Sequence, residues 1–503
     1  MANIYTVAIQ GLKGNLVEVE TNLSRHLPKV IIVGLPDTAV QEARERVWAA
    51  IENSGFVFPR QKVVINLAPA QVQKSGGAYD LSMAISVLQA SSELKSISEH
   101  SAFIGELSLT GLVKAVPGIM VMVAALKDLG FEDIFVPQKN AKEASVIDGV
   151  NIYPVTDLAQ LVRHLNDQQK ILAQKPVDFF DLPSQASFDF QEVQGQTQAK
   201  RALEIAAAGG HNILMVGPPG SGKTMLAKSF LSILPPLSLS DALAVSKIHS
   251  LAGLLNEENY LVRSRFLRSP HHSASVSAIV GGGSSPKSGE ISLAHKNVLF
   301  FDEILEFPLA VLEALRQPLE DKIITVSRIK GSVDYPADFI FLATANPCPC
   351  GYLTDPTHEC HCTPQEILKY RKKLSGPLLD RIDLHLSVTK VKSNDLIHSS
   401  RAAESSQSIL TRVLKARTNQ KVRQQNLLNS NLSSKEVRQY CLASKKVEKI
   451  LLAASENMQL SARAYFKILK VARTIADLAN CENIEEEHIL EALQYRNKIW
   501  SEL

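Results

Sequence analysis

One segment in the middle of the chain constrains the fold more than any other. It reads Gly217-Pro218-Pro219-Gly220-Ser221-Gly222-Lys223-Thr224. The apolar run Ile213-Leu214-Met215-Val216 precedes it and Met225-Leu226-Ala227-Lys228 follows, which predicts the order strand, tight loop and helix. In such a loop, backbone N–H groups turn inward on phosphate oxygens and the start of the helix adds its positive dipole end. We therefore expect Lys223 to reach the terminal phosphates of a nucleotide and the Thr224 hydroxyl to bind Mg²⁺.

Composition sets wide limits on the rest of the chain. With 503 residues, 45% hydrophobic and 21% charged, the chain has ordinary globular composition and the length of about three domains. The first residues lack a basic segment followed by an apolar core, and no apolar run approaches the ~18 residues of a membrane span. We therefore expect a cytoplasmic protein with no membrane partner. A net charge of +3 permits nucleic acid as a partner but does not argue for it.

Two further strand ends complete the expected nucleotide site. The run Val298-Leu299-Phe300-Phe301 is typical of a buried parallel strand, and Asp302 and Glu303 follow it. Asp302 is the expected Mg²⁺ partner, and Glu303 is the expected base that activates the attacking water. A third strand, residues 339–345, ends at Asn346, whose amide suits a water near the γ-phosphate. An acidic turn after a strand and ordinary asparagine turn chemistry are the alternatives.

Residues 1–165 alternate short strand-like runs with helical stretches. Lys74-Ser75-Gly76-Gly77-Ala78-Tyr79-Asp80, Gly105 to Gly111 and Val136-Pro137 together resemble the proteolytic domain of Lon-type proteases. Ala78 stands where that family places its nucleophilic serine, and residues 117–125 contain no lysine to act as a base. We interpret this stretch as a catalytically inactive Lon-like domain that contacts DNA or other subunits, with a purely structural role as the alternative. Residues 166–188 have the composition of a linker.

Three longer motifs carry a more specific resemblance. They are Gly289 to His295, the stretch from Phe301-Asp302-Glu303 to Leu315-Arg316-Gln317-Pro318-Leu319-Glu320, and Thr344-Ala345-Asn346-Pro347-Cys348-Pro349-Cys350-Gly351. The chain resembles the magnesium-chelatase-like AAA+ proteins of the ComM/YifB family over essentially its whole length. The resemblance implies an α/β fold with an AAA+ core at 189–390, pore insertions and a C-terminal helical lid at 391–503. It also implies a homo-hexameric ATPase that acts on single-stranded, double-stranded and branched DNA as a branch-migration helicase in natural transformation.

The same resemblance assigns two arginines. Arg381, in Leu378-Leu379-Asp380-Arg381-Ile382-Asp383, matches the arginine finger, a guanidinium that neutralises charge on a neighbouring subunit's γ-phosphate. An ion pair with Asp380 or Asp383 is the alternative. Arg463, at the start of a predicted helix that runs to Leu478, matches the second sensor, and whether it serves its own subunit's nucleotide or a neighbour's is left open.

Four of the six cysteines lie within fifteen residues. Cys348-Pro349-Cys350 and Cys360-His361-Cys362 form two Cys-x-Cys pairs, a pattern typical of a tetrahedral structural Zn²⁺ site. Substitution of one ligand by His358 or His361, or a reduced cluster without metal, are the alternatives. Four cysteines leave no open coordination position, so the pattern indicates structure more than catalysis.

Two basic insertions are candidates for DNA contact. Lys287 follows a glycine-rich run, and Arg328 and Lys330 lie in residues 326–333, which predict a hairpin. In related ring ATPases such projections line the pore, where these three side chains would meet backbone phosphates. Solvated loops are the alternative. A basic helical stretch with Arg412, Arg417 and Arg423 could also hold phosphates or simply form a solvated helix face.

Two other functions compete with the DNA motor. A protein-remodelling or chelatase-type AAA+ ATPase would share the nucleotide site and bind no DNA. An ATP-dependent protease is opposed by Ala78 and by the missing lysine.

Overall fold

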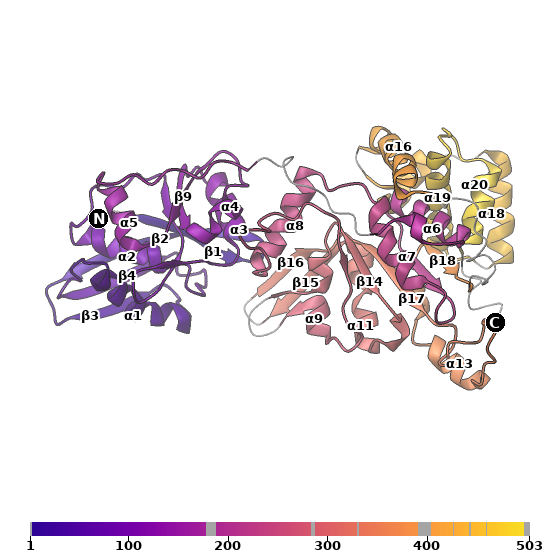
Figure 1. The fold of residues 1–503 in the computed structure, drawn as a ribbon, viewed down its shortest axis with the longest axis horizontal. Coiled ribbons are helices and arrows are strands. Elements are labelled where there is room, and N and C mark those ends of the chain that lie inside the picture. The colour runs from indigo at the N-terminus through magenta and orange to yellow at the C-terminus, as the bar shows by residue number, and fades with distance from the viewer. Residues whose placement is uncertain are drawn as a thin grey trace. The chain divides into compact units, whose positions relative to one another are not determined.

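The computed structural model describes residues 3–177, 188–282, 287–328, 331–390, 404–425, 427–441, 444–458 and 460–496. It consists of two compact units (Figure 1). The first contains Met1–Pro183 and Ser238–Val262, and the second contains Ser184–Leu237 and Arg263–Leu503. The stretch Ser238–Val262 thus belongs to the first unit although it lies within the expected AAA+ range. No helix in the described part of the chain combines the length and the apolar character that a membrane span needs.

The first unit is built on a seven-stranded mixed sheet in the order β3-β4-β2-β1-β5-β8-β9. The strands are β1 (Ile4–Gln10), β2 (Lys13–Ser24), β3 (Lys29–Val33), β4 (Lys62–Ala68), β5 (Ser101–Phe103), β8 (Asp133–Pro137) and β9 (Asn151–Val155). A small hairpin pairs β6 (Glu106–Leu107) with β7 (Val113–Lys114). Val63, Ile65 and Leu67 alternate with partly exposed residues along β4, so one face of this strand enters the core.

The described part of the first unit contains six α-helices. They are α1 (Thr38–Asn53), α2 (Asp80–Ala90), α3 (Ile119–Asp128), α4 (Ala141–Ala144), α5 (Leu158–Leu165) and α8 (Leu239–Leu251), with the 3-10 turn η1 (Gln138–Asn140). Helix α8 packs on α3, and the N–H of Gly118 donates to the carbonyl of Ser250 over 2.9 Å. Leu261 joins the same hydrophobic core. The stretch Ser238–Val262 therefore completes the core of the first unit.

The second unit contains a five-stranded sheet in the order β11-β14-β17-β10-β18. Its strands are β11 (Leu267–Arg268), β14 (Val298–Phe301), β17 (Ile340–Ala345), β10 (Ile213–Val216) and β18 (Leu384–Ser387). All four strand pairs are parallel, and every residue of β10 and β14 is buried. Burial of whole strands is expected when helices cover both faces of a parallel sheet. This confirms the predicted α/β core.

Two hairpins accompany this sheet. One joins β12 (Gly281–Gly282) to β13 (Lys287–Ser288), and the other joins β15 (Ile323–Arg328) to β16 (Gly331–Pro336). In the second hairpin Val326 lies opposite Val333, so the hairpin predicted from residues 326–333 is confirmed. It precedes β17, as expected.

The remaining helices fall into two groups along the chain. Those before residue 390 are α6 (Thr197–Gly209), α7 (Lys223–Ser229), α9 (Val276–Val280), α10 (Glu290–Leu293), α11 (Leu309–Ala314), α12 (Arg316–Asp321), α13 (Pro364–Arg371) and α14 (Gly376–Leu379), with the 3-10 turns η2 (Phe190–Glu192), η3 (Phe230–Ile233) and η4 (Ile304–Glu306). The C-terminal region contains α16 (Ser406–Gln424), α17 (Ser434–Tyr440), α18 (Lys445–Asn457), α19 (Ala462–Leu478) and α20 (Glu486–Gln494), with η5 (Asn429–Asn431).

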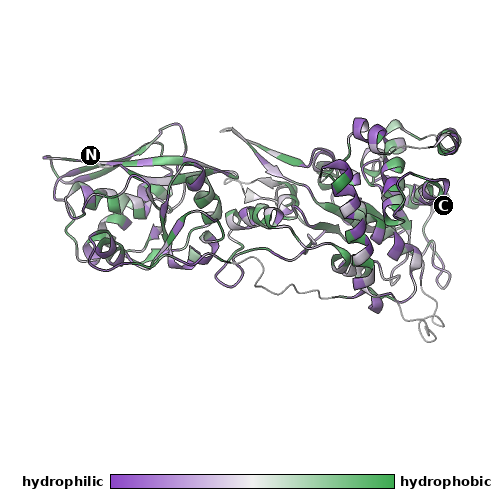
Figure 2. Cartoon of the chain, turned by 90° about the horizontal axis from the view of Figure 1, so that it is seen from above, coloured by the Kyte–Doolittle hydropathy of each residue, from purple (hydrophilic) through white to green (hydrophobic). Residues whose placement is uncertain are grey.

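Helix α6 joins the sheet to the C-terminal helices. It packs against both α16 and α19, and Figure 1 shows it among these yellow and orange helices. Both purple and green residues occur along these helices in Figure 2, as expected for amphipathic helices that share one core. Ser433 caps α17 and forms a capping box with Glu436.

Candidate nucleotide-binding site

The carboxyl ends of three neighbouring strands meet at one edge of the second sheet. Gly217 follows β10, Asn346 follows β17 and Asp302 follows β14. Because β17 pairs with both other strands, Asn346 lies between the phosphate loop and the two carboxylates. Ligands of open parallel sheets bind at this edge.

The phosphate loop, Gly217–Thr224, is held by its own lysine. Lys223 Nζ donates to the carbonyls of Gly217 over 2.7 Å and Pro218 over 2.9 Å. Burial lowers the pKa of Lys223, while the negative charges of Asp302 and Glu303 oppose that shift. Gly220 and Gly222 have φ values of +75° and +87°, which side chains disfavour. At Gly217 a Cβ would lie 2.1 Å from the Val388 carbonyl oxygen, so only glycine fits there.

Thr224 and Asp302 lie in direct contact. The Thr224 hydroxyl donates to Asp302 Oδ2 over 3.0 Å, which brings the two expected Mg²⁺ ligands together. The Thr344 hydroxyl donates to Asp302 Oδ1 and accepts from the N–H of Glu303 over 2.9 Å. Sequence reasoning missed Thr344. Its signal is a fully buried hydroxyl in a strand of otherwise apolar side chains, two residues before Asn346.

Asn346 links the lysine to the glutamate. Its Oδ1 accepts from Lys223 Nζ over 3.4 Å, and its Nδ2 lies 3.5 Å from Glu303 Oε1. Glu303 has a left-handed backbone, with φ +50°, and sparsely populated conformations of this kind cluster at functional sites. The Glu303 carboxylate, the Asn346 amide and the Lys223 ammonium group thus place an acceptor, a donor and a cation close together. Such a set suits an attacking water beside a phosphate.

The four clustered cysteines converge in the loop after Asn346. All four Sγ atoms lie within 4.8 Å of one another, and Cys348, Cys350 and Cys360 are separated by 3.4 to 3.7 Å. A tetrahedron with Zn–S bonds of about 2.3 Å has edges of about 3.8 Å, so these sulfurs fit a zinc ion. The N–H of Cys350 donates to Cys362 Sγ, as outer-shell donors do in metal sites. Although burial opposes it, hydrogen bonds from the Tyr352 N–H and neighbouring thiols lower the pKa of Cys350 to about 6.

The cysteine loop, residues 348–362, touches the phosphate loop. A Cβ at Gly351 would lie 2.7 Å from Pro219 Cδ, so the two loops are in van der Waals contact at a glycine. Inside the cysteine loop, the buried Asp355 carboxylate accepts from Lys390 Nζ over 3.0 Å. Its hydrogen bonds with Thr357 hold the pKa of Asp355 well below its usual range. The cysteine loop is thus anchored next to the nucleotide site.

Arg381 lies near the amino-terminal ends of the strands, opposite the carboxyl ends where the phosphate loop lies. It precedes β18, and its carbonyl accepts from Asn212 Nδ2 at the start of the parallel neighbour β10. Glu320, in the last turn of α12, accepts from the guanidinium groups of both Arg381 and Arg463. The alternative ion pair of Arg381 with Asp380 or Asp383 is not formed, because Asp380 pairs with Arg496, and Asp383 with Lys467 and His211.

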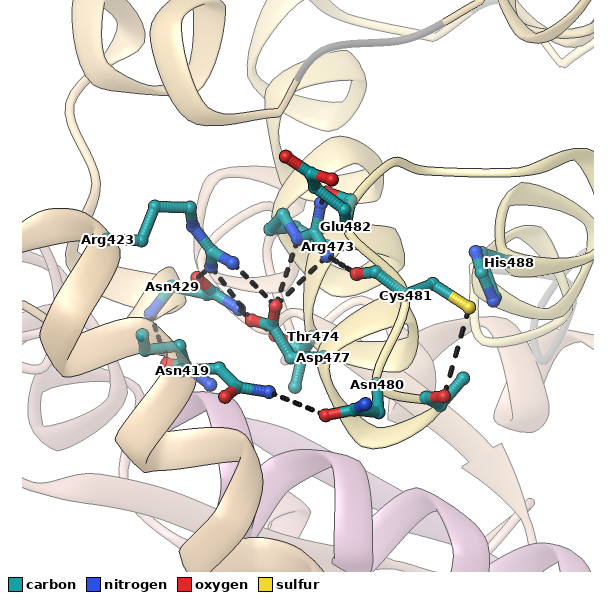
Figure 3. Close-up of polar contacts among 12 residues, drawn as sticks. Asn419, Arg423, Asn429, Arg473, Thr474, Asp477, Asn480, Cys481, Glu482 and His488 are labelled. Atoms are coloured by element: carbon teal, nitrogen blue, oxygen red, sulfur yellow. Dashed lines mark hydrogen bonds and ion pairs between the residues drawn. The ribbon is translucent and has the colours of Figure 1, made fainter.

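A buried polar cluster fixes α19, the helix that begins next to Arg463. Asp477 accepts from Arg423 over 2.6 Å, from Arg473 over 3.0 Å and from Asn429 over 2.8 Å (Figure 3). The side chains of Arg473 and Asp477 are each only 1% exposed. On the same helix, Thr474 bonds His211 Nε2 over 2.7 Å and thereby ties α19 to the start of β10. The position of Arg463 therefore depends on contacts between several elements.

The basic residues expected to contact DNA fall into two groups: those whose side chains the structure does not describe, and those that bind other residues of the second unit. Lys330 lies outside the described residues, and so do the side chains of Lys287 and Arg328, whose backbones belong to β13 and β15. In the basic helical stretch, Arg412 pairs with Glu204 and Glu404, Arg417 donates to the Ala207 carbonyl, and Arg423 pairs with Asp477. The stretch thus uses these three arginines inside the second unit.

In the first unit, Ala78 lies buried just before α2. Its methyl group cannot attack a peptide bond. The buried Asp80 accepts from Arg46 and from the N–H of Leu107. Burial, only partly offset by Arg46, raises the pKa of Asp80 to about 6. These residues hold α1, α2 and the β6–β7 hairpin together.

Comparison with known proteins decides the family. The model of magnesium chelatase subunit ChlI matches residues 189–396, and that of the subunit's C-terminal part matches residues 403–496. Competence protein ComM of Haemophilus influenzae is 40% identical over 504 residues, covering 99% of this chain and 97% of the relative. The YifB protein of Escherichia coli is 41% identical over 98% of this chain and 96% of the relative. The chain belongs to the ComM/YifB family of magnesium-chelatase-like AAA+ proteins.

The family assignment also covers the first unit. A further model, subunit ChlI of magnesium chelatase, matches residues 19–140.

A protein outside this family matches a part of the chain. A Lon protease of Mycolicibacterium smegmatis is 24% identical over 168 residues, which cover 31% of this chain and 21% of the relative. Membership of the AAA+ family supports an ATPase activity that uses ATP and Mg²⁺. AAA+ proteins are typically oligomeric.

Proposed function

We propose that this member of the ComM/YifB family is an ATP-driven DNA motor. It acts as a homo-hexamer in the cytoplasm and drives branch migration of recombination intermediates during natural transformation. The observation that carries the ATPase is the meeting of Lys223, Thr224, Asp302, Glu303 and Asn346 at one edge of the sheet. The DNA part is supported by 40% identity, over nearly the full length, to a protein named for competence.

We assign each residue at this edge a role in hydrolysis, and its position supports that assignment. The N–H groups of Gly220, Ser221 and Gly222 cradle phosphate oxygens, and Lys223 exchanges its carbonyl partners for the terminal phosphates. Thr224 and Asp302 hold Mg²⁺, which when bound neutralises charge on the phosphates. Glu303 takes a proton from the attacking water, and Asn346 orients that water.

A ring is supported by where the arginines lie. Arg381 sits level with Asn212, whereas the phosphate loop begins at Gly217, five residues along β10. At about 3.3 Å per residue this separation is roughly 16 Å, more than an arginine side chain spans. Arg381, and Arg463 beside it, would therefore serve a neighbouring subunit's nucleotide as arginine finger and second sensor.

The remaining assignments complete this proposal. Cys348, Cys350, Cys360 and Cys362 hold a structural Zn²⁺, supported by the match of their sulfur spacings to a tetrahedron. Lys287, Arg328 and Lys330 contact DNA phosphates from the insertions. The Lon-like domain, residues 1–165, is catalytically inactive because Ala78 replaces the nucleophile. A linker at 166–188 connects it to the AAA+ core at 189–390, from which Ser238–Val262 joins the first unit, and to the lid at 391–503.

A second candidate function is a chelatase-type or protein-remodelling ATPase that does not act on DNA. The three matching family models, which are all named for a magnesium chelatase subunit, favour it. Both functions use the same nucleotide site. They differ in whether DNA changes the rate of ATP hydrolysis.

The deciding experiment measures ATP hydrolysis by the full chain with no DNA and with single-stranded, double-stranded and four-way-junction DNA. We expect DNA to stimulate turnover, and Glu303→Gln to lower kcat by 10²-fold or more while nucleotide binding remains. A branch-migration assay on the junction would follow. Turnover that is the same with every DNA, together with no DNA binding, would favour the second function.

The zinc assignment has its own test. Purified protein should contain one zinc per chain by metal analysis, and Cys360→Ser should lose the metal and unfold at a lower temperature. Cys481→Ser is the matched control, because Cys481 lies far along the chain from the four-cysteine group. Full metal content in Cys360→Ser would contradict the four-cysteine site.

A further inference from the structure

Three elements far apart in the sequence meet at one carboxylate. Glu320 Oε1 accepts from Arg463 Nη2 over 2.7 Å, and Glu320 Oε2 accepts from Arg381 Nη2. Glu320 belongs to α12, Arg381 lies before β18, and Arg463 lies in the first turn of α19. Each arginine therefore uses a different oxygen of the same side chain.

We propose that Glu320 is a positioning residue that holds Arg381 and Arg463 side by side, so that both guanidinium groups meet the phosphates of one neighbouring nucleotide. The inference rests on the proposed function of the two arginines. It adds a residue that touches neither substrate nor metal and acts through the arginines.

The physical reason is the repulsion between two cations. Two guanidinium groups at adjacent positions repel each other, and a carboxylate between them reverses the sign of the interaction. Arg381 has a second anchor, since its Nη1 donates to the Pro377 carbonyl over 2.7 Å. Arg463 is 57% exposed, and Glu320 is its only partner among the contacts of the described residues. Without Glu320, Arg463 would be free to turn away from Arg381.

The exposed fractions of Glu320 and the two arginines are consistent with contact to a neighbouring subunit. Glu320 is 42% exposed and Arg381 is 16% exposed, so the cluster faces the surface with both arginines already oriented. Phosphates carry more negative charge than one carboxylate and can share the guanidinium groups without displacing them. Orientation before the reaction is what arginine fingers need, because small displacements at a reacting centre cost large factors in rate.

The opposite role for Glu320 would be a mask that competes with phosphate. Removal of a mask raises activity, whereas removal of a positioning residue lowers it. The two roles therefore predict opposite signs for the same substitution.

The first test is Glu320→Gln in the full chain, which keeps the size of the side chain and removes its charge. We expect kcat for ATP to fall about tenfold, with KM and the affinity for a fluorescent ATP analogue within twofold of wild type. Glu404→Gln is the matched control, because Glu404 also is an exposed glutamate that pairs with an arginine, Arg412. This control should keep the wild-type rate.

The second test separates positioning from simple loss of structure. Glu303→Gln subunits cannot hydrolyse their own ATP but still offer both arginines, whereas Glu320→Gln subunits keep an intact nucleotide site. Mixed in equal amounts, the two should hydrolyse ATP several-fold faster than the mean of the separate proteins. A misfolded Glu320→Gln chain would give no such rescue.

A second mixture separates two results: failure of the role of Glu320 and failure of the proposed function of the arginines. Arg381→Ala mixed with Glu303→Gln should show the same rescue if the arginine acts on a neighbour. Rescue in this mixture combined with a wild-type or raised rate for Glu320→Gln alone overturns the role of Glu320 and leaves the motor standing. No rescue with Arg381→Ala overturns the proposed role of the arginines, and the inference falls with it.

Discussion

Gly351 has no side chain at the point where the cysteine loop meets the phosphate loop. Its φ is +85°, and a Cβ there would lie 2.7 Å from Pro219 Cδ. Gly351→Ala should therefore push the two loops apart, at a cost of about 1–2 kcal/mol for the backbone alone. We expect a lower kcat for ATP and a lower thermal unfolding temperature.

Gly376→Ala is the matched control for this substitution. Gly376 has no atom within 4 Å of an added Cβ and has no positive φ. Its thermal unfolding temperature should stay at or slightly above the wild-type value, because alanine favours helix. Equal behaviour of the two variants would contradict a functional contact between the loops.

The buried His385 should make the free energy of unfolding depend on pH. It is buried in β18, and burial, together with the charges of Arg496 and Lys467, lowers its pKa to about 4. Because the unfolded chain has a histidine pKa near 6.5, the unfolded state binds the proton first as the pH falls. The contribution of His385 is therefore complete above pH 6.5 and is lost toward pH 4.

The measurement is the free energy of unfolding from urea titrations at pH 7.5 and pH 5. Wild type should lose about 2 kcal/mol more over this interval than His385→Gln, since other titrating groups act equally in both proteins. Parallel losses in the two proteins would show that His385 takes up no proton on unfolding.

Asp477 is the centre of the contacts that hold the C-terminal helices together. It binds Arg423 from α16, Arg473 from its own helix and Asn429 from η5 (Figure 3). Asp477→Ala would leave the buried Arg473 without its carboxylate, and removal of one partner of a buried ion pair costs about 3–5 kcal/mol. We expect a large drop in unfolding temperature, and a drop in kcat because α19 carries Arg463.

The control for Asp477→Ala is Glu448→Ala, which removes an exposed carboxylate from α18. Its unfolding temperature should stay within the small range of surface substitutions. An Asp477→Ala protein as stable as this control would mean that the cluster contributes specificity but little net stability.

Elements with local signals could be predicted from the sequence, and those with long-range causes could not. The hairpin at residues 326–333 and the strand before Asp302 follow from neighbouring residues, and both are confirmed. Glu320 meets Arg381 across 61 positions and Arg463 across 143, which no local pattern encodes. No local pattern encodes the contact of Thr344 with Asp302 either. The same is true of α8, which follows the phosphate loop in the chain but belongs to the first unit.

At the scale of the whole molecule, the separation of the arginines from the phosphate loop has a consequence for assembly. If Arg381 and Arg463 serve a neighbour's nucleotide, as proposed, a single subunit should hydrolyse ATP slowly, and faster once a neighbour supplies the guanidinium groups. An arginine finger contributes a factor of about 10³–10⁵ in rate. Hydrolysis per subunit should therefore rise steeply with protein concentration and level off where rings are complete.

This prediction is checked by ATPase rates over a wide range of protein concentrations, with the assembly state followed by light scattering. The rise in rate should coincide with the rise in mass. Arg381→Ala should assemble over the same range but keep the low rate, because the proposed arginine finger would be missing from the assembly. A rate per subunit that does not change with concentration while the mass increases would mean that each subunit completes its own site, and the two arginines would then be structural.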